Sequence, residues 1–202
     1  MNEKAQVWNV PNRISAARLV LSIVVFVLIP LDYFGAALFT FIVAAGTDWI
    51  DGWYARKYDQ VTQLGRILDP FCDKILICGV FILLAIAMEE KFRWYMAITG
   101  WMAVLVTGRE LLVTVLRSLI EGAGGDFSAK MAGKLKMWFQ CIAAGSCLYA
   151  LMYQDLYPGK QLAPWLVVVL IVSIWAAVFS TVHSGILYVF AAKKYLLVEN
   201  KE

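Results

Sequence analysis

Four aspartates and two glycines stand close together in a chain that is otherwise strongly apolar. They are Asp48, Asp51, Gly52, Gly65, Asp69 and Asp73. An ionised side chain is costly at membrane depth, so acids flanked by long apolar stretches indicate a functional site. Four carboxylates within 26 residues also repel one another unless cations lie among them. The simplest interpretation is a metal site at a membrane surface.

The charges of these aspartates suit divalent cations. Four carboxylates carry −4 and two divalent ions would carry +4, which leaves a site able to accept an anionic diphosphate. Ligand sets made of oxygen alone favour Mg²⁺ or Mn²⁺ over zinc. Gly52 and Gly65 lack side chains where a substrate has to approach the backbone closely. A lone membrane aspartate is more often a helix cap or the partner of an arginine, but four at this spacing favour the metal site.

Helical periodicity places the acids in two groups. At 100° per residue, small and charged residues share one face of a helix expected over 35–56. These residues are Asp48, Asp51, Gly52, Ala55 and Arg56.

The second group begins the next helix, expected over 70–88. Asp69 and Asp73 are one turn apart, and Pro70 fits best at the first helical position, which would put both carboxylates in the opening turns. The two pairs of aspartates then lie at the same end of adjacent antiparallel helices, joined by a short loop. They can converge on one site.

The composition predicts an all-α, polytopic membrane protein. The chain has 202 residues, of which 61% are apolar and 16% charged, with a mean hydropathy of +0.70. A membrane span needs about 20 mostly apolar residues, so we expect one domain over residues 1–202, with residues 1–13 as a short interfacial segment. Six transmembrane helices are expected, over 14–32, 35–56, 70–88, 94–118, 132–153 and 164–191.

Basic residues predict the orientation of these helices. Of the 18 lysines and arginines, all but Lys91, Arg93 and Lys160 fall on the side that contains both termini. Because lysine and arginine are enriched in cytoplasmic loops, both termini should be cytoplasmic. An odd number of spans would break this partition.

The spacing of the acidic motif resembles the signature of the CDP-alcohol phosphotransferases. The matching string is Asp48-x2-Asp51-Gly52-x2-Ala55-Arg56-x8-Gly65-x3-Asp69-x3-Asp73. The resemblance implies six transmembrane helices, a homodimer and a site with two metal ions that opens to the cytosol. It also implies transfer of a substituted phosphate from a CDP-linked donor to an alcohol, with release of CMP.

The resemblance also implies roles for individual residues. The metal ligands would be Asp48, Asp51, Asp69 and Asp73. Asp73 would in addition be the general base that takes the proton from the acceptor hydroxyl. The pocket for the CDP part of the donor would contain Asp51, Gly52, Ala55, Arg56 and Gly65.

Two further segments are similar to bacterial phosphatidylglycerophosphate synthases within that family. They are Gly108-Arg109-Glu110 with Arg117, and Gly133-Lys134-x-Lys136-x3-Gln140, in which Met137 replaces the usual threonine. This likeness implies CDP-diacylglycerol and glycerol 3-phosphate as substrates, and a bacterial inner membrane enzyme whose active site faces the cytoplasm.

Four basic residues of these segments suit the phosphate of the acceptor. They are Arg109, Arg117, Lys134 and Lys136, which the expected topology places on the active-site side. Arginine offers phosphate a two-pronged fork and lysine a point charge. The alternative is simple anchoring of the helices by positive charge on the cytoplasmic side.

Other functions remain open from the sequence. The same family includes enzymes whose acceptor is inositol phosphate, serine or phosphatidylglycerol. Membrane prenyltransferases also bind diphosphates through aspartates, but their two motifs lie far apart in longer chains. A divalent-cation transporter is a third possibility, although internal repeats and interrupted helices are typical of transporters and absent from this sequence. Nothing in the chain indicates a nucleic-acid partner.

Overall fold

Six long α-helices and one short 3₁₀ helix make up the described part of the protein. The computed structural model describes residues 10–58, 63–122 and 130–199. It does not describe the side chains of residues 10–13, 48–58, 63–70, 73, 119, 121–122, 130–134 and 194–199. The elements are α1 (Val10–Leu28), α2 (Phe34–Tyr58), α3 (Gln63–Glu89), η2 (Trp94–Met96), α4 (Gly100–Gly122), α5 (Lys130–Leu156) and α6 (Pro164–Glu199).

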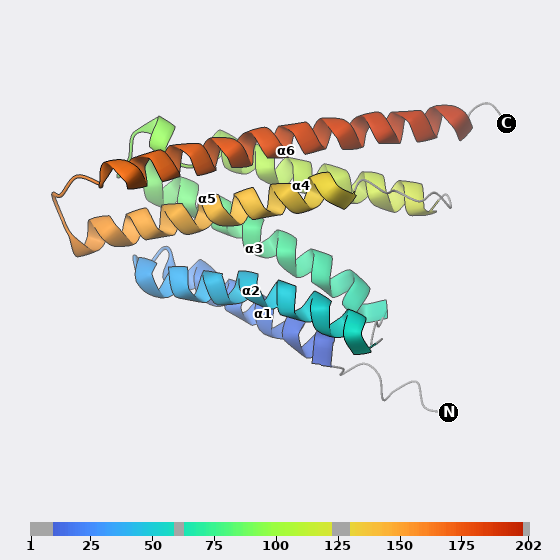
Figure 1. Ribbon diagram of the computed structural model, residues 1–202, viewed down its shortest axis with the longest axis horizontal. Helices are drawn as coiled ribbons and strands as arrows, with labels where there is room; N and C mark the ends of the chain where they lie inside the picture. Colours follow the sequence, from blue (N-terminus) through green and yellow to red (C-terminus); the bar gives the residue numbers. More distant parts are fainter. Residues whose placement is uncertain (1–9, 59–62, 123–129, 200–202) are drawn as a thin grey trace.

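The helices run alternately in opposite directions along an elongated bundle (Figure 1). α1 begins, and α6 ends, at the end of the bundle where α2 ends and α3 begins. We call this the motif end, and the opposite end, which holds the α1–α2 and α5–α6 connections, the turn end. α1 packs against α2 and α3, α4 against α3 and α6, and α5 against α2 and α6.

Proline and residues with positive φ mark the connections at the turn end. α1 ends just before Pro30, and Asp32 adopts φ 59°, a left-handed conformation that aspartate tolerates better than most residues. Gly159 has φ 80° in the connection between α5 and α6. Pro164 is the first residue of α6, where its fixed φ suits a helix and its missing N–H costs nothing.

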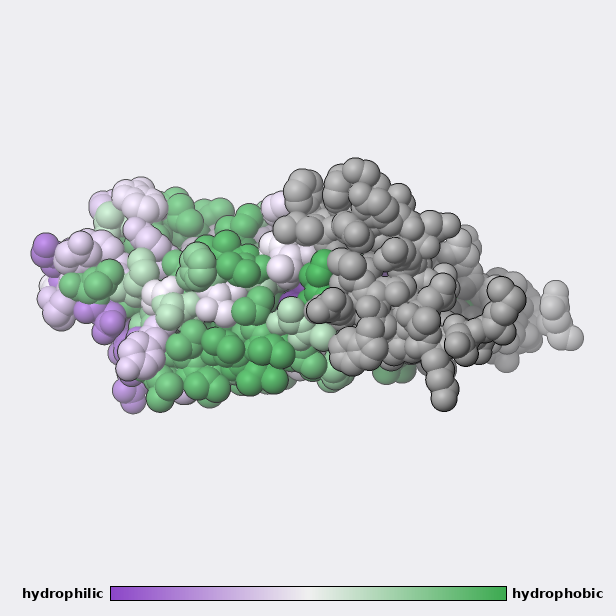
Figure 2. All heavy atoms as spheres, turned by 90° about the horizontal axis from the view of Figure 1, so that it is seen from below, coloured by the Kyte–Doolittle hydropathy of each residue, from purple (hydrophilic) through white to green (hydrophobic). Residues whose placement is uncertain are grey.

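Apolar side chains lie both inside the bundle and on its surface. Fully buried residues include Val25, Leu84 and Leu148, whereas Phe39 and Val104 are more than 70% exposed. Figure 2 shows the apolar surface next to a hydrophilic turn end. Exposed apolar surface on this scale is typical of contact with lipid, so the protein is an integral membrane protein.

Three helices in the described residues are long and apolar enough to cross a membrane. They are Trp94–Ser118, Leu135–Leu156 and Pro164–Lys193, and two shorter apolar helical stretches are Ile14–Leu28 and Phe34–Thr47. The all-α prediction is confirmed. The count of six membrane crossings and the cytoplasmic orientation of both termini stay predictions.

The predicted start of the third helix was wrong. α3 begins at Gln63, so Pro70 lies inside the helix instead of at its first position. Proline lacks only one backbone donor, the one that would bond to the carbonyl of residue 66, and membrane helices tolerate such a loss. Asp69 and Asp73 therefore lie in the second and third turns of α3. Residues 1–9 of the predicted interfacial segment lie outside the described residues, and residues 10–13 belong to α1.

Gly79 allows α3 to pack closely against α1. A Cβ atom at this position would overlap the ring of Phe26. We expect Gly79→Ala to lower the free energy of unfolding by about 1–3 kcal/mol, because overpacking forces backbone and side chains to shift. Thermal unfolding in detergent measures this loss of stability.

Gly145→Ala is the control, because its Cβ would meet no atom within 4 Å. Equal melting temperatures for the two variants would contradict the prediction, and Phe26→Leu should restore part of the loss in the Gly79 variant.

Candidate active site

The four aspartates of the motif lie on two consecutive helices at the motif end. Asp48 and Asp51 belong to α2, and Asp69 and Asp73 belong to α3. α2 ends at Tyr58 and α3 begins at Gln63, so the two helices are joined by four residues. The aspartates of each pair are three or four residues apart. Because both stretches are helical, each pair therefore lies about one turn apart on its helix.

The side chains of the whole predicted motif lie outside the described residues. This applies to the four aspartates and to the predicted donor-pocket residues Gly52, Ala55, Arg56 and Gly65. Among the side chains that the structure does describe, no group of three His, Cys, Asp or Glu residues could hold a metal ion. The side chains of the motif are not among these, so the predicted ligands stay predictions.

α1 is bonded to both motif helices next to the aspartates. The buried Arg18 donates from Nε to Thr47 Oγ1 at 3.4 Å, and Thr47 immediately precedes Asp48. Cys72, which immediately precedes Asp73, donates from Sγ to the carbonyl of Ser15 at 3.5 Å. These two contacts tie α2 and α3 to the same helix at the positions where the motif lies.

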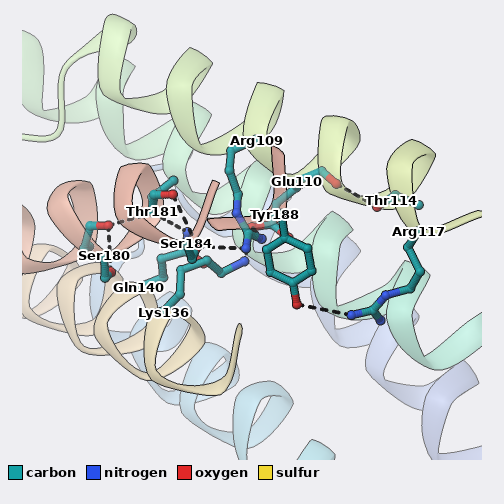
Figure 3. A network of polar contacts seen from close by, with 11 residues as sticks. Arg109, Glu110, Thr114, Arg117, Lys136, Gln140, Ser180, Thr181, Ser184 and Tyr188 are labelled. Atoms are coloured by element: carbon teal, nitrogen blue, oxygen red, sulfur yellow. Dashed lines mark hydrogen bonds and ion pairs between the residues drawn. The ribbon is translucent and has the colours of Figure 1, made fainter. Parts of the chain in front are cut away.

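A buried charged cluster joins α4, α5 and α6 (Figure 3). Glu110 accepts from Arg109 Nη1 at 3.1 Å and also from Lys136 Nζ. Arg109 Nη2 donates to Ser184 Oγ at 2.8 Å. Arg109, Glu110 and Lys136 are each no more than 9% exposed. Buried charges are retained only when they are paired and hydrogen-bonded, and here one carboxylate serves two cations.

Tyr188 on α6 links this cluster to a third cation. Its ring centroid lies 5.2 Å from Arg109 Cζ, and its hydroxyl accepts from Arg117 Nη2 at 3.3 Å. Tyr188 is 2% exposed, so its position is fixed by packing. We define the basic cluster as Arg109, Glu110, Arg117, Lys136, Ser184 and Tyr188.

The basic cluster has an excess of positive charge. It holds three cations and one carboxylate, a net charge of about +2 with all four groups ionised. Arg109 Nε is buried and has no hydrogen-bond partner among the described residues. An unsatisfied buried donor is costly. The arrangement therefore suits a small ligand with two negative charges.

The structure brings together most of the predicted acceptor-phosphate residues. Arg109 and Lys136 meet at Glu110, and Arg117 joins them through Tyr188. Lys134 lies in α5, but its side chain is outside the described residues.

Ser184 and Tyr188, which orient the two arginines, are not among the predicted site residues. A signal for them does exist, because Thr181, Ser184 and Tyr188 follow one another at intervals of three and four in an apolar helix. Thr181 accepts from Gln140 Nε2 at 3.0 Å and so belongs to the same polar face.

Comparisons with known proteins agree with the signature. The model of the CDP-alcohol phosphatidyltransferase family matches residues 8–183. The chain is similar to a Bacillus subtilis protein named CDP-diacylglycerol–glycerol-3-phosphate 3-phosphatidyltransferase, with 35% identity over 88% of this chain and 92% of the relative. Proteins with the same name from Rickettsia bellii (30% identity, 93% and 97% coverage) and Escherichia coli (33%, 70% and 78%) are also similar. The chain therefore belongs to the CDP-alcohol phosphatidyltransferase family.

Proposed function

We propose that the protein transfers a phosphatidyl group from CDP-diacylglycerol to glycerol 3-phosphate, giving phosphatidylglycerol phosphate and CMP. The similar proteins from three bacteria carry the name of this reaction. The observation that supports this acceptor is the basic cluster, because an acceptor with its own phosphate needs a cationic site in addition to the motif. Serine as acceptor would have no phosphate monoester to bind there.

The motif suits the divalent ions that this family generally uses. Asp48, Asp51, Asp69 and Asp73 would hold two Mg²⁺ or Mn²⁺ ions. They supply only oxygen ligands from two helices that α1 ties together. Bound ions would neutralise the diphosphate of the donor and the charge that develops on the CMP leaving group.

Protein residues would bind and orient both substrates around that site. The CDP part of the donor would contact Asp51, Gly52, Ala55, Arg56 and Gly65. Arg109, Arg117, Lys134 and Lys136 would hold the phosphate of the acceptor, with Ser184 and Tyr188 orienting the arginines.

Asp73 would accept the proton of the acceptor hydroxyl. The acceptor oxygen then bonds to the β-phosphorus of the donor while the phosphoanhydride bond breaks and CMP leaves. One carboxylate suffices as base, so we propose direct in-line attack with inversion at phosphorus and no covalent enzyme intermediate.

We also propose where the protein lies in the cell and how it assembles. The chain would be a single membrane domain with six spans in a bacterial inner membrane, with both termini and the active site on the cytoplasmic side. The alternating helices agree with this, because the first helix begins and the last ends at the motif end (Figure 1). The active form would be a homodimer.

Release of CMP across a panel of alcohols tests the proposed acceptor. Detergent-solubilised protein is mixed with CDP-diacylglycerol and Mg²⁺, and one alcohol is added at a time. We expect CMP with glycerol 3-phosphate and little with serine, inositol phosphate or phosphatidylglycerol. Equal release with serine would overturn the acceptor while leaving the family unchanged.

Replacement of Tyr188 should weaken acceptor binding in two steps. Tyr188→Phe keeps the ring beside Arg109 but removes the hydroxyl that accepts from Arg117. Loss of one such bond should raise the KM for glycerol 3-phosphate about 2- to 10-fold. Tyr188→Leu removes both contacts and should raise this KM further. Steady-state kinetics should show an unchanged KM for CDP-diacylglycerol.

The matched control is Tyr153→Phe, because Tyr153 packs against Tyr157 near the turn end. An equal rise in both substrate KM values for Tyr188→Phe would show that Tyr188 acts on the fold as a whole and not on the acceptor site.

A further inference from the structure

We propose that a cleft at the turn end binds the phosphate group of an anionic phospholipid. The cleft has a volume of about 610 Å³ and lies between the α3–α4 connection and the α5–α6 connection. Lys91, Arg93 and Lys160 line it, together with Tyr95, Gln154 and Gln161. It lies at the opposite end of the bundle from the aspartate motif, so it is distinct from the proposed active site (Figure 1).

The distribution of basic residues along the chain points to this cleft. Only three of the 18 lysines and arginines belong to the connections at the turn end, and all three line the same cleft. None of the described residues that line it is acidic. The acids at this end, Asp32, Glu89, Glu90 and Asp155, lie outside the lining and are exposed.

The three cations differ in how free they are to bind a ligand. Lys91 Nζ contacts Asp32 Oδ1 at 3.0 Å and lies 4.6 Å from the ring centroid of Phe34. Lys160 Nζ lies 5.0 Å from the ring centroid of Tyr157. Arg93 is exposed and forms no ion pair within the described part of the chain. Its guanidinium can therefore offer a phosphate two parallel hydrogen bonds, with the lysines adding charge.

The walls of the cleft favour a lipid over free phosphate. Phe92, Met96, Leu162 and Val167 supply an apolar side to the same cleft. The hydrophilic turn end adjoins the apolar surface in Figure 2, which is the position of a lipid head group relative to its acyl chains. The exposed Trp94 lies in the α3–α4 connection and the exposed Trp165 in the first turn of α6, and tryptophan is enriched at membrane interfaces. Basic side chains close to a membrane surface attract anionic head groups through their charge.

Thermal unfolding of the full chain in a non-ionic detergent tests the proposal. The probes are dioleoylphosphatidylglycerol, dioleoylphosphatidylcholine and inorganic phosphate. A ligand that binds only the folded protein raises its melting temperature. We expect phosphatidylglycerol to raise the melting temperature by several degrees more than phosphatidylcholine does, and millimolar phosphate to have little effect. No difference between the two lipids, or an equal shift with phosphate, would overturn the proposal.

Substitutions at the cleft separate this site from lipid binding elsewhere. In the triple variant Lys91→Gln, Arg93→Gln, Lys160→Gln, phosphatidylglycerol should raise the melting temperature no more than phosphatidylcholine does. Arg93→Gln alone should lose most of the extra rise. The triple variant Lys193→Gln, Lys194→Gln, Lys201→Gln removes the same charge near the C-terminus and should keep the difference. A full difference in the cleft variants would place the lipid somewhere else and overturn the assignment.

Asp32→Asn offers a variant with the opposite expected effect. It removes the carboxylate that competes for Lys91, and asparagine keeps the left-handed backbone at this position. We expect the half-maximal rise in melting temperature to occur at a lower phosphatidylglycerol concentration in Asp32→Asn than in the wild type. A higher concentration would exclude Lys91 from the site.

Discussion

Replacing Asp73 with asparagine should lower the rate of CMP release by about 10² to 10⁴-fold, the usual contribution of a general base. An amide cannot accept the proton of the glycerol 3-phosphate hydroxyl, so attack on the β-phosphorus is slowed. Binding of CDP-diacylglycerol should be largely retained. The measurement is single-turnover release of CMP with both substrates at saturation, alongside binding of labelled donor.

The two proposed roles of Asp73 can be told apart with the same variant. If its loss mattered only for holding a metal ion, raising the Mg²⁺ concentration should restore turnover. If Asp73 is the base, turnover should stay low at every Mg²⁺ concentration. Asp155→Asn is the control, because Asp155 is an exposed carboxylate near the turn end. Unchanged turnover in Asp73→Asn would remove Asp73 from the base role.

Replacing Arg109 with alanine should lower kcat/KM for glycerol 3-phosphate by roughly 10 to 150-fold, the worth of a hydrogen bond to a charged group. Arg109 contacts three other members of the basic cluster, Glu110, Ser184 and Tyr188. Its loss would remove the proposed guanidinium donor to the phosphate of the acceptor. The measurement is the dependence of CMP release on glycerol 3-phosphate at fixed CDP-diacylglycerol, and on CDP-diacylglycerol at fixed acceptor.

A conservative variant checks that the effect comes from binding and not from the fold. Arg109→Lys keeps the charge but loses the fork, so its kcat/KM should lie between those of wild type and Arg109→Ala. Lys193→Ala removes an exposed cation on α6 and should leave kcat/KM unchanged for both glycerol 3-phosphate and CDP-diacylglycerol. If Arg109→Ala raised the KM for donor and acceptor equally, the cluster would be structural and the proposed acceptor site would be wrong.

Much of the fold followed from local patterns in the sequence. The apolar composition predicted membrane helices, and proline and polar residues placed most of their ends within a few residues of those in the structure. Three ends differ by more: α3 begins at Gln63 instead of 70, α4 at Gly100 instead of 94, and α6 ends at Glu199 instead of 191. At Pro70 the reason is that one missing backbone donor does not end a helix whose other bonds are intact. The spacing of the aspartates needed only helical periodicity, which is a property of residues close together in the chain.

The sequence by itself determined the type of protein and the composition of its motif, since both depend on residue types and on spacings of a few positions. Only the tertiary structure decided which distant groups meet. Arg109 and Ser184 are 75 residues apart in the chain, and Arg117 and Tyr188 are 71 apart. Arg18 reaches Thr47 across 29 residues. Such pairs form because particular helix faces pack together, and the period of one helix does not specify the face of another that it will meet.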